Sequence, residues 1–220
     1  MDAVQLTKLQ AQVEALLNLA IRALERFVFL RPMMVNRQLQ DRFTSEGQNI
    51  AFTRLRNWLY WGFIQELLKI CLDADERTPC ISKIAGKLQQ PDINSALELS
   101  YSSSSVWSEA ELRSEFQRLH ADFQRRAEEM LNSKAAGGYK TVRDKLIAHN
   151  ELRQTGKEYE FYDVKGLGLK YGDERQLLET VKQLVVDLAL LVRKTDFSWD
   201  NIVEWETKNV CEFWEIDSIE

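Results

Sequence analysis

An apolar stripe at the start of the chain is the feature that most constrains its fold. Eight apolar residues recur at intervals of three and four: Leu6, Leu9, Val13, Leu16, Ala20, Ala23, Phe27 and Leu30. This spacing places one apolar face along a helix of about seven turns. The stripe favours core packing within a helical bundle, and a seam between two chains is the second interpretation. Pro32 is expected to end or kink the helix.

Helix-breaking residues are scarce in the rest of the chain. With nine glycines and three prolines among 220 residues, few positions interrupt long helices. The sequence predicts further helices over residues 48–72, 82–88, 108–130 and 173–194. Ser108 followed by Glu111 has the spacing of a capping box. The stretch 135–138 is predicted to break the helix before it, and the serine-rich stretch 100–105 to form a loop.

The fold class predicted from these patterns is all-α, an up-and-down helical bundle. Alternation between 158 and 169 predicts one or two strands with turns at Gly166 and Gly168, so we expect a small extended or β insertion near 158–170. One domain is expected over 1–195. An acidic C-terminal extension over 196–220 carries three tryptophans and is expected to dock on that domain.

The aromatic side chains of the second predicted helix are interpreted as core. They are Trp58, Tyr60, Trp61 and Phe63. A base-stacking platform is the second interpretation. His120 is likewise expected to be a surface or core residue without a catalytic role.

The composition is that of an ordinary soluble protein, with 45% hydrophobic and 29% charged residues. The net charge of −5 argues against binding nucleic acid over the whole surface, and no DNA partner is expected. The chain has no apolar run of membrane-spanning length and no signal-peptide pattern at its start, so we expect no membrane partner and a cytoplasmic location.

Cysteine and histidine usage bears on redox state and metals. Cys71, Cys80 and Cys211 form no C-x-x-C pair. Reduced thiols are favoured, with a Cys71–Cys80 disulfide as the alternative. Two histidines without a cysteine cluster make a structural zinc site improbable, and no metal or other cofactor is expected.

The segment 143–151, Arg-Asp-Lys-Leu-Ile-Ala-His-Asn-Glu, combines a fixed cation with a titratable base. An arginine can hold a phosphate, and a histidine can take a proton from a ribose 2′-hydroxyl, so the pair suits RNA cleavage without a metal ion. On a straight α-helix Arg143 and His149 lie about 120° apart. The two side chains could converge if His149 lies at a fraying helix end, but a motif completed across the two-fold axis of a dimer is the more natural arrangement. Lys145 and His149 share a helix face.

The string Arg143-Asp144-(four residues)-His149 resembles the R-x(4–6)-H signature of the HEPN superfamily, and the fuller string and the region 72–82 are similar to its AbiU-type, abortive-infection branch. The resemblance implies a helical homodimer with facing motifs and metal-independent endoribonuclease activity. It implies Arg143, Asp144 and His149 as catalytic residues, and Lys145 and Asn150 are candidate substrate-binding residues.

The same resemblance implies partners and a biological role. RNA is the expected substrate, an antitoxin or neutralising protein is a candidate partner, and the role is that of a toxin in antiphage defence. Some relatives are modified on a tyrosine two residues after the histidine. The corresponding residue here is Glu151, so this chain departs from that scheme. A non-catalytic homodimer that binds RNA or protein is the alternative function.

Overall fold

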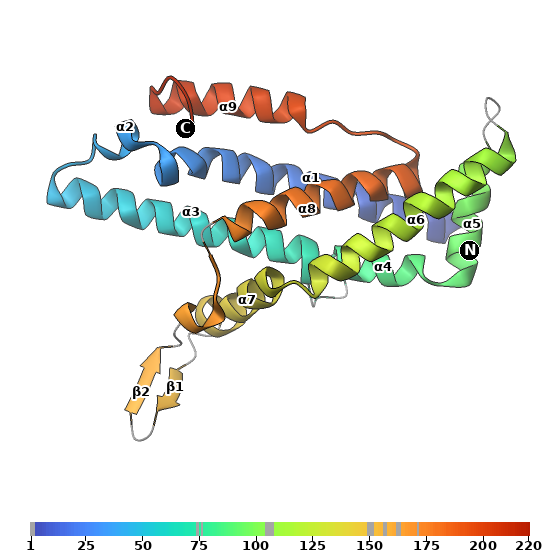
Figure 1. The fold of residues 1–220 in the computed structure, drawn as a ribbon, viewed down its shortest axis with the longest axis horizontal. Coiled ribbons are helices and arrows are strands. Elements are labelled where there is room, and N and C mark those ends of the chain that lie inside the picture. Colours follow the sequence, from blue (N-terminus) through green and yellow to red (C-terminus); the bar gives the residue numbers. More distant parts are fainter. Residues whose placement is uncertain are drawn as a thin grey trace. The chain divides into compact units, whose positions relative to one another are not determined.

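The computed structural model describes residues 3–73, 75, 77–103, 108–148, 152–155, 158–161, 164–170 and 172–220. Within these residues the chain is almost entirely helical (Figure 1). The α-helices are α1 (Ala3–Val35), α2 (Arg37–Gln40), α3 (Glu46–Leu72), α4 (Ile81–Leu88), α5 (Pro91–Ser102), α6 (Glu109–Leu131), α7 (Lys134–Val142), α8 (Asp173–Leu188) and α9 (Asp200–Trp214). The prediction of an all-α bundle is confirmed. Over the described residues, no helix has both the length and the apolar character needed to cross a membrane.

The chain divides into two compact units. The first contains residues 1–20 and 67–197, and the second contains residues 21–66 and 198–220. The apolar stripe of α1 contributes to both. All of its residues except Leu6 are buried, with exposed fractions between 0% and 7%. The stripe is therefore core, as the first interpretation of the sequence held, and α1 continues past Pro32 to Val35.

In the first unit, α6 packs against α5 and α8 (Figure 1). The capping box predicted at the start of α6 is confirmed. The Ser108 hydroxyl accepts a hydrogen bond from the Glu111 amide at 3.3 Å, and the Glu111 carboxylate accepts one from the Ser108 amide at 3.3 Å. Facing side chains fill the interior. The buried apolar residues of α6 and α8 are Leu112, Phe116, Phe123, Ala127, Met130, Leu177, Leu178, Val181, Leu184, Val185 and Leu188.

In the second unit, the C-terminal segment packs on the end of α1, on α2 and on the start of α3. Met33, Leu39, Phe52 and Ile216 form a buried cluster, against which Trp214 packs. The Asn36 side-chain amide donates a hydrogen bond to the Ser218 carbonyl at 2.9 Å. The tail is thus held by both apolar and polar contacts. The division into a domain over 1–195 and an extension over 196–220 stays a prediction.

Three local predictions from the sequence are wrong. The serine-rich stretch 100–105 was predicted to form a loop, but residues 100–102 are the end of α5, and residues 104 and 105 lie outside the described residues. The stretch 135–138 was predicted to break a helix, but it lies inside α7, and the break falls at Asn132 and Ser133. The Ser133 hydroxyl accepts a hydrogen bond from the Ala136 amide at 3.1 Å and starts a new helix there. Trp58 was interpreted as core, but its side chain is 73% exposed, whereas Phe63 is fully buried.

A small hairpin interrupts the helices between α7 and α8. Strands β1 (Leu152–Thr155) and β2 (Glu158–Phe161) pair antiparallel, with Leu152 opposite Phe161. Extended structure was predicted near 158–170, and β2 occupies the start of that range. The residues Val164–Leu167 instead form a 3-10 helix. In the described part of this region, the paired strands therefore include residues 152–155, where no strand was predicted.

Candidate functional site

The motif found in the sequence begins where α7 changes its geometry. The residues Arg143–Ala148 form a π-helical segment that directly follows Val142, the last residue of α7. A π-helix is wider than an α-helix because its hydrogen bonds join residues five apart. Such segments are rare and frequently occur at functional sites. A second π-helical segment, Ala189–Arg193, follows α8 and contains no such motif. The unusual backbone at 143–148 therefore coincides with the sequence motif but does not identify it by itself.

A buried polar contact fixes the helix that carries the motif. Tyr139 lies one α-helical turn before Arg143 and is 1% exposed. Its hydroxyl donates a hydrogen bond to Oε2 of Glu174 at 3.1 Å. The Glu174 carboxylate is itself buried and also accepts hydrogen bonds from the Gly172 amide at 3.1 and 3.2 Å. This contact ties α7 to the start of α8 and holds the motif helix in place.

A close packing contact holds α7 on a second side. A Cβ atom on Gly138 would lie 2.7 Å from Cδ2 of Leu169. Only glycine leaves room for that approach without a shift of Leu169. The same change at the neighbouring Gly137 would meet nothing within 4 Å. Gly138 therefore has a packing role that Gly137 lacks.

Arg143 and Asp144 form an ion pair at the start of the π-helix. The Nε and Nη2 atoms of Arg143 both lie 2.7 Å from Oδ1 of Asp144. Their side chains are 21% and 40% exposed. One edge of the guanidinium thus faces the carboxylate, and Nη1 donates no hydrogen bond to a residue that the structure describes. That nitrogen can reach a phosphate oxygen while Asp144 orients the group.

Of the remaining predicted site residues, the structure describes only Lys145. Lys145 is half-buried in the π-helix. His149 and Asn150 lie outside the described residues. The expected separation of about 120° between Arg143 and His149 assumed an α-helix throughout. Because residues 143–148 are π-helical, that angle does not apply to them.

The other histidine has structural contacts. Nε2 of His120 lies 3.1 Å from the Leu88 carbonyl oxygen and 3.1 Å from the Asn94 side-chain amide. Its ring stacks on Phe116 with an interplanar angle of 14°. The ring therefore joins α6 to the end of α4 and the start of α5, in agreement with a non-catalytic role.

The described residues contain no group of three or more His, Cys, Asp or Glu side chains that could hold a metal ion. Cys71, Cys80 and Cys211 are all free thiols, so the alternative of a Cys71–Cys80 disulfide is not formed. Burial raises the pKa of the Cys71 thiol well above its ordinary value, and the neighbouring Cys80 raises it further. Cys71 is thus a core thiol and no nucleophile.

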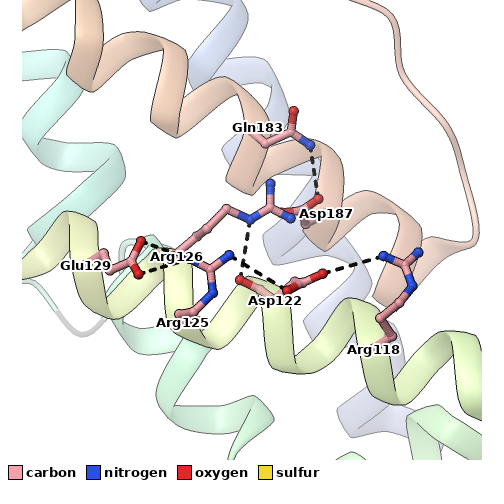
Figure 2. Close-up of polar contacts among 7 residues, drawn as sticks. All are labelled: Arg118, Asp122, Arg125, Arg126, Glu129, Gln183 and Asp187. Atoms are coloured by element: carbon pink, nitrogen blue, oxygen red, sulfur yellow. Dashed lines mark hydrogen bonds and ion pairs between the residues drawn. The ribbon is translucent and has the colours of Figure 1, made fainter.

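Sequence reasoning missed a polar network between α6 and α8, which Figure 2 shows. Nη2 of Arg126 lies 2.8 Å from Oδ2 of Asp187, whose side chain is 3% exposed. The Gln183 side-chain amide donates a hydrogen bond to Oδ1 of Asp187 at 3.2 Å. Burial raises the pKa of Asp187, although the Gln183 hydrogen bond and the Arg126 charge counteract that rise. No sequence motif joins these residues, because they come from two separate helices.

Comparison with known proteins adds one finding to this geometry. Residues 6–212 match the family model of the HEPN AbiU2 proteins. The matched range includes the motif helix and nearly all of the described fold. No curated protein and no solved structure matches the chain significantly.

Proposed function

Because this chain belongs to the HEPN AbiU2 family, we propose that it is a metal-independent endoribonuclease with Arg143, Asp144 and His149 as its catalytic residues. The observation that carries the proposal is the Arg143–Asp144 pair in a π-helical segment. The pair leaves part of an oriented guanidinium able to bind an anion. Phosphate is the anion that an arginine fork recognises best in nucleic acids.

The reaction needs one proton acceptor and one proton donor. The ribose 2′-oxygen attacks the adjacent phosphorus and gives its proton to a base, and the bond from phosphorus to the 5′-oxygen breaks. The leaving 5′-oxygen takes up a proton. The products are a 2′,3′-cyclic phosphate and a 5′-hydroxyl, so atoms and charge balance without a metal-bound nucleophile. A histidine such as His149 can accept and donate these protons near neutral pH.

Arg143 is proposed to stabilise the transition state of this reaction. Negative charge accumulates on the phosphate oxygens as the 2′-oxygen attacks, and a guanidinium placed there stabilises the transition state. Asp144 orients the guanidinium through its contacts with Nε and Nη2. Lys145 and Asn150 are proposed to bind the RNA beside the reacting phosphate.

The proposed site is completed in a homodimer. One motif supplies a single arginine and a single histidine, whereas a two-fold axis would place two such pairs along one RNA groove. In the cell, this activity would act as a toxin of the abortive-infection type, with an antitoxin or neutralising protein as partner. Light scattering at micromolar protein concentration tests the dimer, because a monomer would contradict the shared groove.

The activity is tested with total RNA in the presence of a metal chelator. Wild-type protein is expected to release fragments ending in 2′,3′-cyclic phosphate. Arg143→Ala and His149→Ala are expected to abolish cleavage and any growth toxicity while the fold and dimer persist. Arg113→Ala is the matched control, because Arg113 is an exposed arginine of α6 that pairs only with Glu109.

The alternative function is a non-catalytic dimer that binds RNA or protein. The ion pair favours this alternative in one respect, since Asp144 already neutralises Arg143. RNA binding without cleavage by the wild-type protein would support it. Cleavage that survives both Arg143→Ala and His149→Ala would instead move the chemistry to other residues.

A further inference from the structure

A pocket of about 820 Å³ lies in the first unit, between α6, the start of α7 and α8. This volume falls within the range of small-molecule sites, roughly 300 to 1,000 Å³. Four cationic side chains line it: Arg125, Arg126, Lys134 and Lys170. Gln176 and Gln183 line the pocket as well, and the Gln183 side-chain amide already donates a hydrogen bond to Asp187. It therefore combines positive charge with groups that recognise polar rings.

The acidic side chains that line the pocket are already engaged. Glu129 pairs with Arg125 at 2.9 Å, and Glu179 pairs with Lys182 at 2.8 Å. Oδ2 of Asp173 accepts a hydrogen bond from the Lys170 backbone amide at 2.8 Å. These contacts reduce the negative charge that a bound anion would meet.

Two lysines of the pocket keep their charge available. Lys134 and Lys170 are exposed, and neither ammonium group has a carboxylate partner among the residues that the structure describes. An ammonium without a partner gains most from binding an anion, because no existing ion pair must first be broken. The pocket is thus charged to accept a phosphate or a similar anion.

Arg126 is held in place before any ligand binds. Its Nη2 atom lies 2.8 Å from the buried Asp187 carboxylate, and its Nε donates a hydrogen bond to the Asp122 carbonyl at 3.4 Å. Figure 2 shows the side chain extending from α6 toward Asp187 on α8. An arginine oriented in this way loses little side-chain entropy when it binds a ligand. Its Nη1 atom can then donate to an anion in the pocket.

We propose that this pocket binds a phosphorylated nucleotide, either free or at the end of an RNA chain. Lys134, Lys170 and Arg126 bind the phosphate, and the side-chain amide of Gln176 donates to and accepts from the base. Lysine and arginine are the usual phosphate ligands in proteins. Side-chain amides suit the mixed donors and acceptors of a base edge.

The pocket is distinct from the motif at Arg143. Lys134 is the first residue of α7, whereas Arg143 follows its last residue, Val142, and begins the π-helical segment. Arg143 is not among the described residues that line the pocket. The nucleotide site goes beyond the proposed ribonuclease activity and stands even if that activity is absent.

Titration calorimetry in a metal chelator tests the proposal with defined probes. The probes are AMP, adenosine, and a short RNA with either a 5′-phosphate or a 5′-hydroxyl. The test variant combines Lys134→Gln with Lys170→Gln, two exposed positions that no described contact needs for folding. The control combines Lys8→Gln with Lys208→Gln, which removes the same charge at exposed sites outside the pocket.

AMP is expected to bind the wild-type protein and the control, and the test variant is expected to lose affinity about tenfold. That result assigns the pocket to a free nucleotide. Lysine-dependent binding of the 5′-phosphorylated RNA without binding of AMP assigns it to an RNA end. The proposal is overturned by the absence of binding to any of these probes, by adenosine binding as tightly as AMP, or by equal affinities in the test variant and the control. Because binding is measured apart from cleavage, a failed ribonuclease assay does not affect the outcome.

Discussion

The Tyr139 hydroxyl donates a hydrogen bond at 3.1 Å to the carboxylate of Glu174, and both side chains are almost completely buried. This contact joins α7 to the first turn of α8. The segment between those helices contains the motif and the hairpin. The hydrogen bond thus closes the loop on which the proposed catalytic residues depend.

Tyr139→Phe should lower the free energy of unfolding by about 1 to 3 kcal/mol, because a buried carboxylate loses a donor. The ring remains, so packing changes little. Urea denaturation monitored by circular dichroism measures the shift. Thr141→Val is a suitable control, since its hydroxyl bonds only to the Gly137 carbonyl of its own helix. An unchanged midpoint for Tyr139→Phe would mean that the hydrogen bond does not stabilise the fold.

Adjacent glycines of α7 should respond in opposite directions to alanine. Gly137→Ala places its Cβ in open space, so the gain in helix propensity should stabilise the protein by roughly 0.5 to 1 kcal/mol. Gly138→Ala places its Cβ 2.7 Å from Leu169 and should destabilise it by about 1 to 3 kcal/mol. Thermal unfolding of both variants measures the difference. Two shifts of the same sign would contradict the packing of Leu169 against α7.

Asp187→Asn should change stability in a pH-dependent manner. Burial raises the pKa of Asp187 in the folded state, so folding favours its protonated form. The stability from this carboxyl is therefore present below its unfolded pKa of about 3.9 and decreases as the pH rises through the folded value. The free energy of unfolding of the variant, relative to that of the wild type, should therefore be higher at pH 7 than at pH 3.5. Urea midpoints at both pH values measure the gain, and a constant difference would refute it.

The three thiols should differ in reactivity. Cys71 and Cys80 are buried, whereas Cys211 is half-buried. Burial also raises the pKa of Cys71, which leaves almost no thiolate at neutral pH. A chromogenic thiol reagent should therefore modify Cys211 first, and the other two only after unfolding or local opening. Cys211→Ser should remove the fast phase. Rapid modification of all three thiols in the native protein would contradict this order.

Much of the fold follows from local sequence signals. The stripe of α1 and the capping box at Ser108 each identify a helix from spacing alone, because helical periodicity and end capping are local properties. Predictions failed where a nearby cap was overlooked or where distant residues decide. The stretch 135–138 has the composition of a breaker, but Ser133 starts the helix earlier and Leu169 packs on Gly138. Trp58 has the chemistry of a core residue, yet it is 73% exposed among the described residues.

For the candidate site, too, some features could be predicted from the sequence and others could not. The sequence alone indicated Arg143 and His149 as a pair suited to phosphodiester cleavage, and the family resemblance added Asp144. The π-helical geometry of 143–148 and the anchor from Tyr139 to Glu174 were not visible in it. No sequence pattern indicated the charged pocket, because its lining residues are spread between 125 and 183.

The sequence by itself determined that this chain is helical, which faces of its helices are apolar, and which short string is the candidate for a catalytic site. These properties depend on residues within a few turns of one another. Only the tertiary structure decided that Arg126 meets Asp187, that Tyr139 meets Glu174, and that a charged pocket lies between α6 and α8. Those pairings arise when packed helices bring distant residues within reach, and their strength comes from burial away from water.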